Sequence, residues 1–167
     1  MLKIDSYQKE KKVVLDTDYV CLMLQDYLNG KNSSHRYKEL EHILPDEDDR
    51  TWGINVYTSL TKVLNQENVP GTTLRSFHAL MEHKKLMVSR LEYINNNYAP
   101  IQLDLIEGYK QIEADSTIAR NLLIKSYNNK SSDIQQRLTR KLNDLQGKER
   151  DLLPEIIYCL EKRIPSF

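Results

Sequence analysis

Two histidines and a glutamate are spaced to share one face of a helix. His35, Glu39 and His42 stand at positions i, i+4 and i+7, so a helix over this segment would bring two imidazoles and a carboxylate together. These are ligand types that bind Zn²⁺ or Fe²⁺. The segment is short and polar, however, and a solvated helix face produces the same spacing. We therefore expect no metal and no other cofactor. These three residues remain the candidate ligands for the alternative in which the chain binds a metal.

Other arrangements that could support catalysis are misspaced or missing. His78 and His83 are five positions apart, which turns a helix by about 500° and puts the two rings on different faces. The run from Asp46 to Asp49 could hold Mg²⁺, but acids of this kind are typical of a helix N-terminus. The chain has no Gly-rich phosphate loop, nucleophile elbow or Cys-x-x-Cys motif. An enzyme is therefore not the expected class, and a metal-dependent enzyme is kept as the second alternative.

The elements that must carry these residues are predicted to be helices. The chain has 167 residues, 40% apolar composition and only five Gly and five Pro, which is typical of one helical domain with short connections. We expect an all-α bundle of about six helices over residues 1–167. Short helices in residues 1–45 would flank longer, antiparallel, bundle-forming helices in residues 46–167, the C-terminal two-thirds of the chain.

Local signals place the ends of these helices. The first should begin near Asp16, an N-cap residue, and end at Asn29-Gly30. Acids before Trp52 and a threonine at position 72 or 73 predict two further starts. Near the C-terminus we expect a break at Gly147 and a restart around Asp151, with Pro154 in the first turn of the last helix.

A long apolar seam runs along the segment from residue 101 to 127. Its members recur at steps of four and three, the spacing of a helix packed on another helix. Leu105, Tyr109, Ile112 and Leu123 belong to it. They are our candidates for contact with a partner if the seam is open, and core residues if it is closed.

Charge is balanced overall and uneven locally. Lysine and arginine together number 24, as do aspartate and glutamate, so no net field favours nucleic acid, and we expect no nucleic-acid partner. Bases dominate the stretch from residue 120 to 150. Its candidate basic patch comprises Arg137, Arg140, Lys141, Lys148 and Arg150, whose simplest interpretation is the solvated face of a bundle and whose functional one is peripheral contact with a membrane.

The function that these features favour is binding. The chain has ten Tyr against two Phe and one Trp, and tyrosine suits interfaces because it combines a large apolar body with a polar tip. We expect a non-enzymatic helical protein-interaction module, an adaptor, assembly subunit or effector that binds a protein partner or self-associates. A membrane-surface-binding module that uses the basic C-terminal face is the first alternative. The first residues contain no apolar signal-like run, so we expect a cytoplasmic protein.

Overall fold

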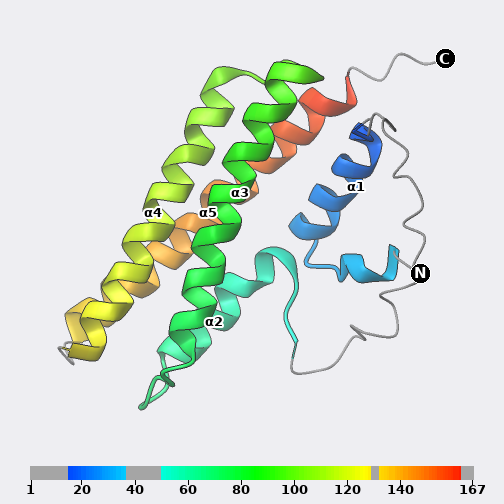
Figure 1. The fold of residues 1–167 in the computed structure, drawn as a ribbon. Helices are drawn as coiled ribbons and strands as arrows, with labels where there is room; N and C mark the ends of the chain where they lie inside the picture. The colour runs from blue at the N-terminus through cyan, green and yellow to red at the C-terminus, as the bar shows by residue number, and fades with distance from the viewer. Residues whose placement is uncertain (1–14, 37–49, 129–131, 163–167) are drawn as a thin grey trace, which may run out of the picture.

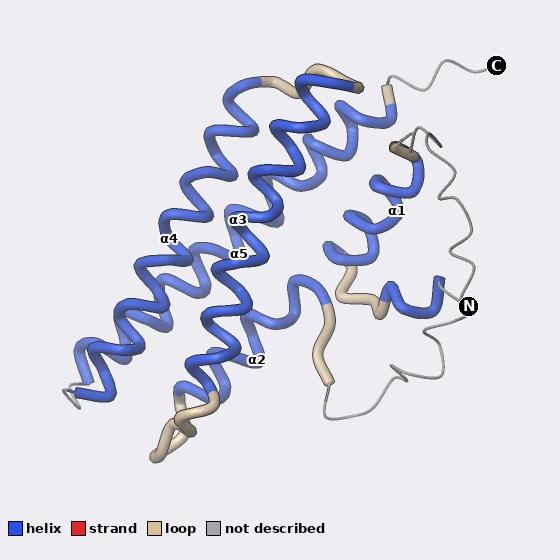
Figure 2. Tube along the Cα trace, viewed as in Figure 1, coloured by secondary structure: helices blue, strands red, loops and turns tan. Residues whose placement is uncertain are grey.

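The chain forms a bundle of α-helices. The computed structural model describes residues 15–36, 50–128 and 132–162, and this part of the chain contains helices and loops but no β-strand (Figure 1; Figure 2). The prediction of an all-α bundle is confirmed. None of the described helices is both long enough and apolar enough to cross a membrane.

Three long helices make up most of the bundle. They are α3 (Thr73–Asn97), α4 (Leu103–Asn128) and α5 (Ser132–Glu161). Because the connections between them are short, they run antiparallel, and α4 packs against both α3 and α5. The expected long helices in the C-terminal two-thirds are therefore present.

Two short helices, placed end to end, fill the fourth position of the bundle. α1 (Thr17–Leu28) lies along the C-terminal half of α5, and α2 (Val56–Leu64) lies along its N-terminal half. The order of the side-chain hydrogen bonds along α5 shows this arrangement. Gln135 donates to the Leu64 carbonyl and Gln146 to the Ile54 carbonyl, whereas Glu149 accepts from Tyr27 and Glu161 accepts from Gln25. α1, which the sequence placed among flanking helices, thus packs along a bundle helix.

Two glycines shape the junction between α1 and α2. Gly30 follows α1, and Gly53 opens a short 3₁₀ helix, η2 (Gly53–Asn55), that leads into α2; their φ angles are 64° and 56°. A Cβ on Gly53 would collide with the backbone carbonyl of Tyr27, whereas one on Gly30 would meet only the side-chain amide of Asn55, which can move aside. Glycine is therefore favoured at both positions by conformation, and at Gly53 also by space. A second 3₁₀ helix, η1 (Ser33–Arg36), follows Gly30.

The long seam of α4 is closed. Leu105 is 7% exposed, and Tyr109, Ile112 and Leu123 have no exposed surface. All four belong to one core cluster with apolar residues of the other helices. Of the two alternatives that the sequence left open, the structure places these residues in the core, where they are not available to a partner while the bundle stays intact.

The helix ends show which local signals determine structure. Asp16 caps α1 by accepting a hydrogen bond from the Tyr19 N–H at 3.0 Å, as predicted. The predicted break at Gly147 and restart near Asp151 are wrong, because α5 continues through both and contains Pro154 in its interior. The continuity is explained by the buried residues Leu142, Leu145, Leu153 and Ile156. The burial of these residues outweighs one glycine and one proline that both face solvent.

Candidate functional site

A buried cluster of polar side chains lies at the centre of the bundle, level with the junction of α1 and α2. Its core is an ion pair between Lys84 of α3 and Glu149 of α5, with Nζ to Oε1 at 2.7 Å and both side chains fully buried. Tyrosines from the three other α-helices surround this pair: Tyr27 of α1, Tyr57 of α2 and Tyr109 of α4. Every α-helix of the described chain therefore contributes to this central cluster.

The hydrogen bonds of the cluster are specific. The Lys84 ammonium donates to both Glu149 oxygens, at 2.7 and 2.9 Å, and to the Tyr27 hydroxyl at 2.7 Å. Tyr27 in turn donates to Glu149 Oε2 at 2.8 Å, and Tyr109 donates to Glu149 Oε1. The ammonium also lies over the rings of Tyr27 and Tyr57, 4.8 and 5.3 Å from their centroids. Within the cluster, only the buried Tyr57 hydroxyl has no hydrogen-bond partner.

The cluster holds its charges by mutual compensation. Burial lowers the pKa of Lys84, and the facing Glu149 opposes that shift. Burial on its own would raise the pKa of Glu149, but Lys84 and the hydroxyls of Tyr109 and Tyr27 bring it below the usual value. Burial and the nearby Glu149 charge raise the pKa values of all three tyrosines. The geometry between Lys84 and Glu149 is that of an ion pair, and the raised pKa values keep the surrounding phenols neutral at neutral pH.

His83 connects this cluster to the protein surface. Its ring stacks on Tyr27 at a centroid distance of 5.3 Å, and its Nδ1 lies 3.4 Å from Lys84 Nζ. Because an ammonium only donates, Nδ1 is the acceptor and the imidazole proton is on Nε2. Burial, followed by the charge of Lys84, lowers the pKa of His83 to about 4. The imidazole is thus neutral at physiological pH.

The chemistry of the central cluster is that of a structural device. Lys84 and Glu149 have no surface that a substrate could touch, although a lysine with a lowered pKa is the type of residue found in active sites. A charged pair buried among apolar side chains instead penalises any packing that separates the two partners. The cluster therefore favours the packing in which Lys84 of α3 faces Glu149 of α5.

The protein surface offers a different kind of site, a groove between α4 and α5. It has a volume of about 520 Å³, and α4 supplies its apolar residues, Ile118 and Leu122. α5 supplies its charged residues: Arg137, Arg140, Lys141 and Asp144. We call this hollow the α4–α5 groove. An apolar surface beside arginines can hold an apolar group and an acidic group side by side.

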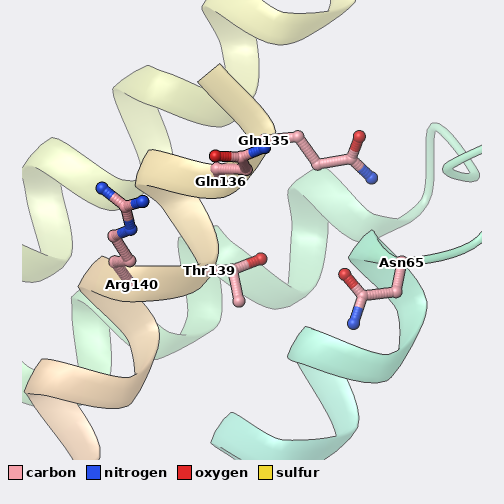
Figure 3. Close-up of a pocket in the computed structure, with 5 residues that line it drawn as sticks. All are labelled: Asn65, Gln135, Gln136, Thr139 and Arg140. Atoms are coloured by element: carbon pink, nitrogen blue, oxygen red, sulfur yellow. The ribbon is translucent and has the colours of Figure 1, made fainter. Parts of the chain in front are cut away.

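A second groove lies on the other side of α5, against the end of α2. It has a volume of about 450 Å³ and is lined by Asn65, Gln135, Gln136, Thr139 and Arg140 (Figure 3). Gln135 donates its amide N–H to the Leu64 carbonyl. In Figure 3, Arg140 points away from Asn65. Since Arg140 also lines the α4–α5 groove, it stands on the ridge that separates the two hollows.

The structure divides the candidate basic patch. Lys141 and Lys148 bind the same buried carboxylate of α4, Asp115, at 3.1 and 2.7 Å. These two lysines join α4 to α5, and together they outweigh burial and lower the pKa of Asp115. Arg150 is exposed and lies two residues after Lys148, about 200° further around the helix. It therefore belongs to another face.

The two remaining arginines of the patch form no close ion pair with another described residue. Arg137 reaches Asp133, one turn away on the same helix, at only 4.0 Å, with both side chains exposed. Arg140 is exposed and makes no ion pair with a residue of the described chain. Arg137 and Arg140 both line the α4–α5 groove, beside its apolar residues.

Only one of the three metal-ligand candidates lies within the described residues. His35 is exposed at the end of η1, with Asn32 Nδ2 at 3.4 Å from its Nε2. Glu39 and His42 lie outside the described residues. Within the described ranges, no group of three His, Cys, Asp or Glu side chains is placed to hold a metal ion.

The central cluster was missed by sequence reasoning, although signals for it exist. Lys84 interrupts the apolar stripe of α3, and Glu149 falls four residues after Leu145 and four before Leu153, two buried positions of α5. A charge at a core position on each of two helices indicates a buried pair. The unusual number of tyrosines has the same origin in part, since three of the ten surround this pair.

Comparison of the chain with protein families, with curated proteins and with solved structures finds no match. The class of the protein is therefore defined by its own geometry. It is an all-α bundle with a split fourth helix, a central ion pair and an apolar groove with a cationic wall.

Proposed function

We propose that the protein is a non-enzymatic helical protein-interaction module that binds a protein partner through the α4–α5 groove. The observation that carries this proposal is the groove itself, in which Ile118 is 46% exposed and Leu122 is partly buried beside two arginines. Large apolar side chains at a concave surface lower the free energy of association when a partner covers them. The rigid helices on both sides reduce the entropy cost of binding.

The chemistry of the central cluster also favours binding over catalysis. Lys84 and Glu149, the residues best suited to acid–base chemistry, are paired with each other and sealed from solvent. What the described surface offers to another molecule is shape, apolar area and positive charge. This combination supports an adaptor, an assembly subunit or an effector.

Site-specific photo-crosslinking in the native cells tests the proposal. A photoreactive amino acid at position 118 should yield a crosslinked protein product, because its side chain would lie under the bound partner. The same amino acid at position 86 is the matched control, since Leu86 is 52% exposed on α3 and outside the groove. A product of twice the chain mass would indicate self-association. Equal labelling from both positions, or no product from position 118, would contradict the proposal.

A further inference from the structure

We propose that the occupant of the α4–α5 groove is an amphipathic helix of the partner whose apolar stripe is bordered by carboxylates, one of which binds Arg140. This inference rests on the proposed function and specifies the chemistry of the partner. It makes two requirements of that partner: apolar side chains at helical spacing, and aspartate or glutamate next to them.

The apolar requirement follows from Ile118 and Leu122. They are one helical turn apart on α4, so they form two adjacent apolar contacts along the groove. Because α4 and α5 are long and antiparallel, the groove between them runs along the helix axes. A helix that lies in such a groove presents apolar residues at i, i+3 or i+4, and i+7. A volume of about 520 Å³ accommodates several such side chains.

The acidic requirement follows from the charges of α5. Three cations and one anion of this helix line the groove: Arg137, Arg140, Lys141 and Asp144. Lys141 is held by Asp115 at 3.1 Å, and Asp144 lies 3.3 Å from Lys148. Arg140 has no ion pair among the described residues, and that of Arg137 is long. Two guanidinium groups are thus available to carboxylates, which they bind through paired hydrogen bonds.

The same observations favour a protein helix over a lipid surface. Membrane-binding surfaces gather four to eight cations in one patch, as a rough guide, whereas this groove mixes two available arginines with Asp144 and with Lys141, whose ammonium binds the buried Asp115. The apolar residues also line a hollow between two helices, which a helix can enter and a lipid bilayer cannot follow closely.

Selection from a displayed library of helical peptides tests the inference. The full-length protein is the target, and the recovered peptides are sequenced and their Kd values measured by fluorescence anisotropy. We expect enrichment of peptides with an apolar stripe bordered by aspartate or glutamate. Arg140→Glu should weaken their binding about tenfold, because an attraction of roughly 1.4 kcal/mol or more is lost when the charge is reversed.

Two matched controls separate charge and apolar contact from general damage. Lys85→Glu makes the same charge change at an exposed position of α3 and should leave Kd unchanged. Ile118→Ser should weaken binding severalfold, whereas Leu86→Ser, on α3, should not. Circular dichroism verifies that each variant is folded, which we expect because all four side chains are exposed.

The outcomes distinguish this inference from the proposed function. A crosslinked partner at position 118, combined with peptides that lack carboxylates or that bind Arg140→Glu equally well, would overturn the inference and leave the proposed function intact. Absence of both a crosslink and an enriched peptide would overturn both. Vesicles of phosphatidylcholine with and without phosphatidylserine form the last arm. Co-sedimentation that requires phosphatidylserine and is lost in Arg140→Glu would assign the groove to lipid and overturn the inference.

Discussion

Lys84 and Glu149 are the residues on which the packing of the bundle depends. Each is fully buried and each would be strongly destabilising alone, because a charge without a partner in a protein interior costs several kcal/mol. Together they are stabilised by their mutual attraction and by the hydroxyls of Tyr27 and Tyr109. The energetic role of either residue can therefore be measured only in relation to the other.

A double-mutant cycle tests this dependence. Lys84→Met should lower the free energy of unfolding by about 3–5 kcal/mol, because it leaves the Glu149 carboxylate buried without its cation. Adding Glu149→Leu should recover a large part of that loss, since the second substitution removes the unpaired charge. Urea denaturation of the two single variants and the double variant gives the coupling energy. Losses that simply add would contradict the proposed pairing.

The pH dependence of the free energy of unfolding should show the protonation of His83. Its pKa is lowered from 6.5 to about 4 in the folded protein, so between these values the unfolded chain binds more protons and stability must rise with pH. The contribution of the neutral His83 imidazole to the free energy of unfolding is fully present above pH 6.5 and is lost as the pH falls towards 4. It amounts to at most about 3 kcal/mol.

Burial is the largest cause of the lowered His83 pKa, and charges on two helices act beside it. Lys84 and Arg90 of α3 lower the pKa, whereas Glu149 of α5 raises it. Urea midpoints measured from pH 4 to 7 should therefore fall less steeply on acidification in His83→Gln than in the unmodified protein. Identical slopes would show that other groups govern the acid response.

At the scale of elements, glycine has opposite effects in the junction and in α5. Gly53 adopts a positive φ and lies against the Tyr27 carbonyl, whereas a Cβ added to Gly147 would meet no packing neighbour within 4 Å. The first position needs glycine and the second merely tolerates it. Helical φ and ψ at Gly147 are accessible to alanine, which has the higher helix propensity.

Two alanine substitutions test this contrast. Gly53→Ala should destabilise the protein by about 2 kcal/mol or more, because it adds backbone strain and a collision with Tyr27. Gly147→Ala should stabilise it by about 0.5–1 kcal/mol. Thermal unfolding followed by circular dichroism should give Tm changes of opposite sign. A lower Tm for Gly147→Ala would mean that α5 requires its glycine for a reason other than space.

At the scale of the whole molecule, the central cluster joins all five α-helices of the described chain. Tyr27 is the contribution of α1, which otherwise packs mainly on α5. A disturbance of its hydroxyl should therefore be felt in α3 and α5 as well as in α1. This expectation distinguishes two cases: one in which α1 shares a cooperative core with α3 and α5, and one in which α1 packs on a bundle that is stable without it.

Hydrogen exchange can detect that coupling. Tyr27→Phe removes two hydrogen bonds to charged groups and should lower stability by about 1.5–3 kcal/mol. Amide exchange should then accelerate in α3 and α5 together with α1. Tyr158→Phe is the control, since Tyr158 is 51% exposed on α5 and should leave exchange unchanged. Acceleration confined to α1 would contradict a shared cooperative unit.

The sequence predicted what local chemistry determines. The capping of α1 by Asp16, its end near Gly30 and the apolar stripes of α3 and α4 could all be predicted, because these signals involve residues a few positions apart. The continuity of α5 could not, since it depends on burial against the other helices. The central ion pair joins residues 65 positions apart. Lys84 and Glu149 can each be recognised in the sequence as a charge within an apolar stripe. The contact between them depends on how α3 and α5 pack, which the sequence pattern does not indicate.

The split fourth helix divides the described chain into two pieces of very different size. The piece before the junction contributes one α-helix, and the piece from Arg50 onward contributes α2 and the three long helices. The two pieces meet through the Tyr27 hydroxyl, the close approach of Gly53 to the Tyr27 carbonyl, and the hydrogen bond from Gln25 to Glu161. All of these contacts are non-covalent and join residues 15–36 to residues 50–162. The bundle is therefore suited to fragment complementation, in which α1 is supplied as a separate peptide and restores the partners of Lys84 and Glu149.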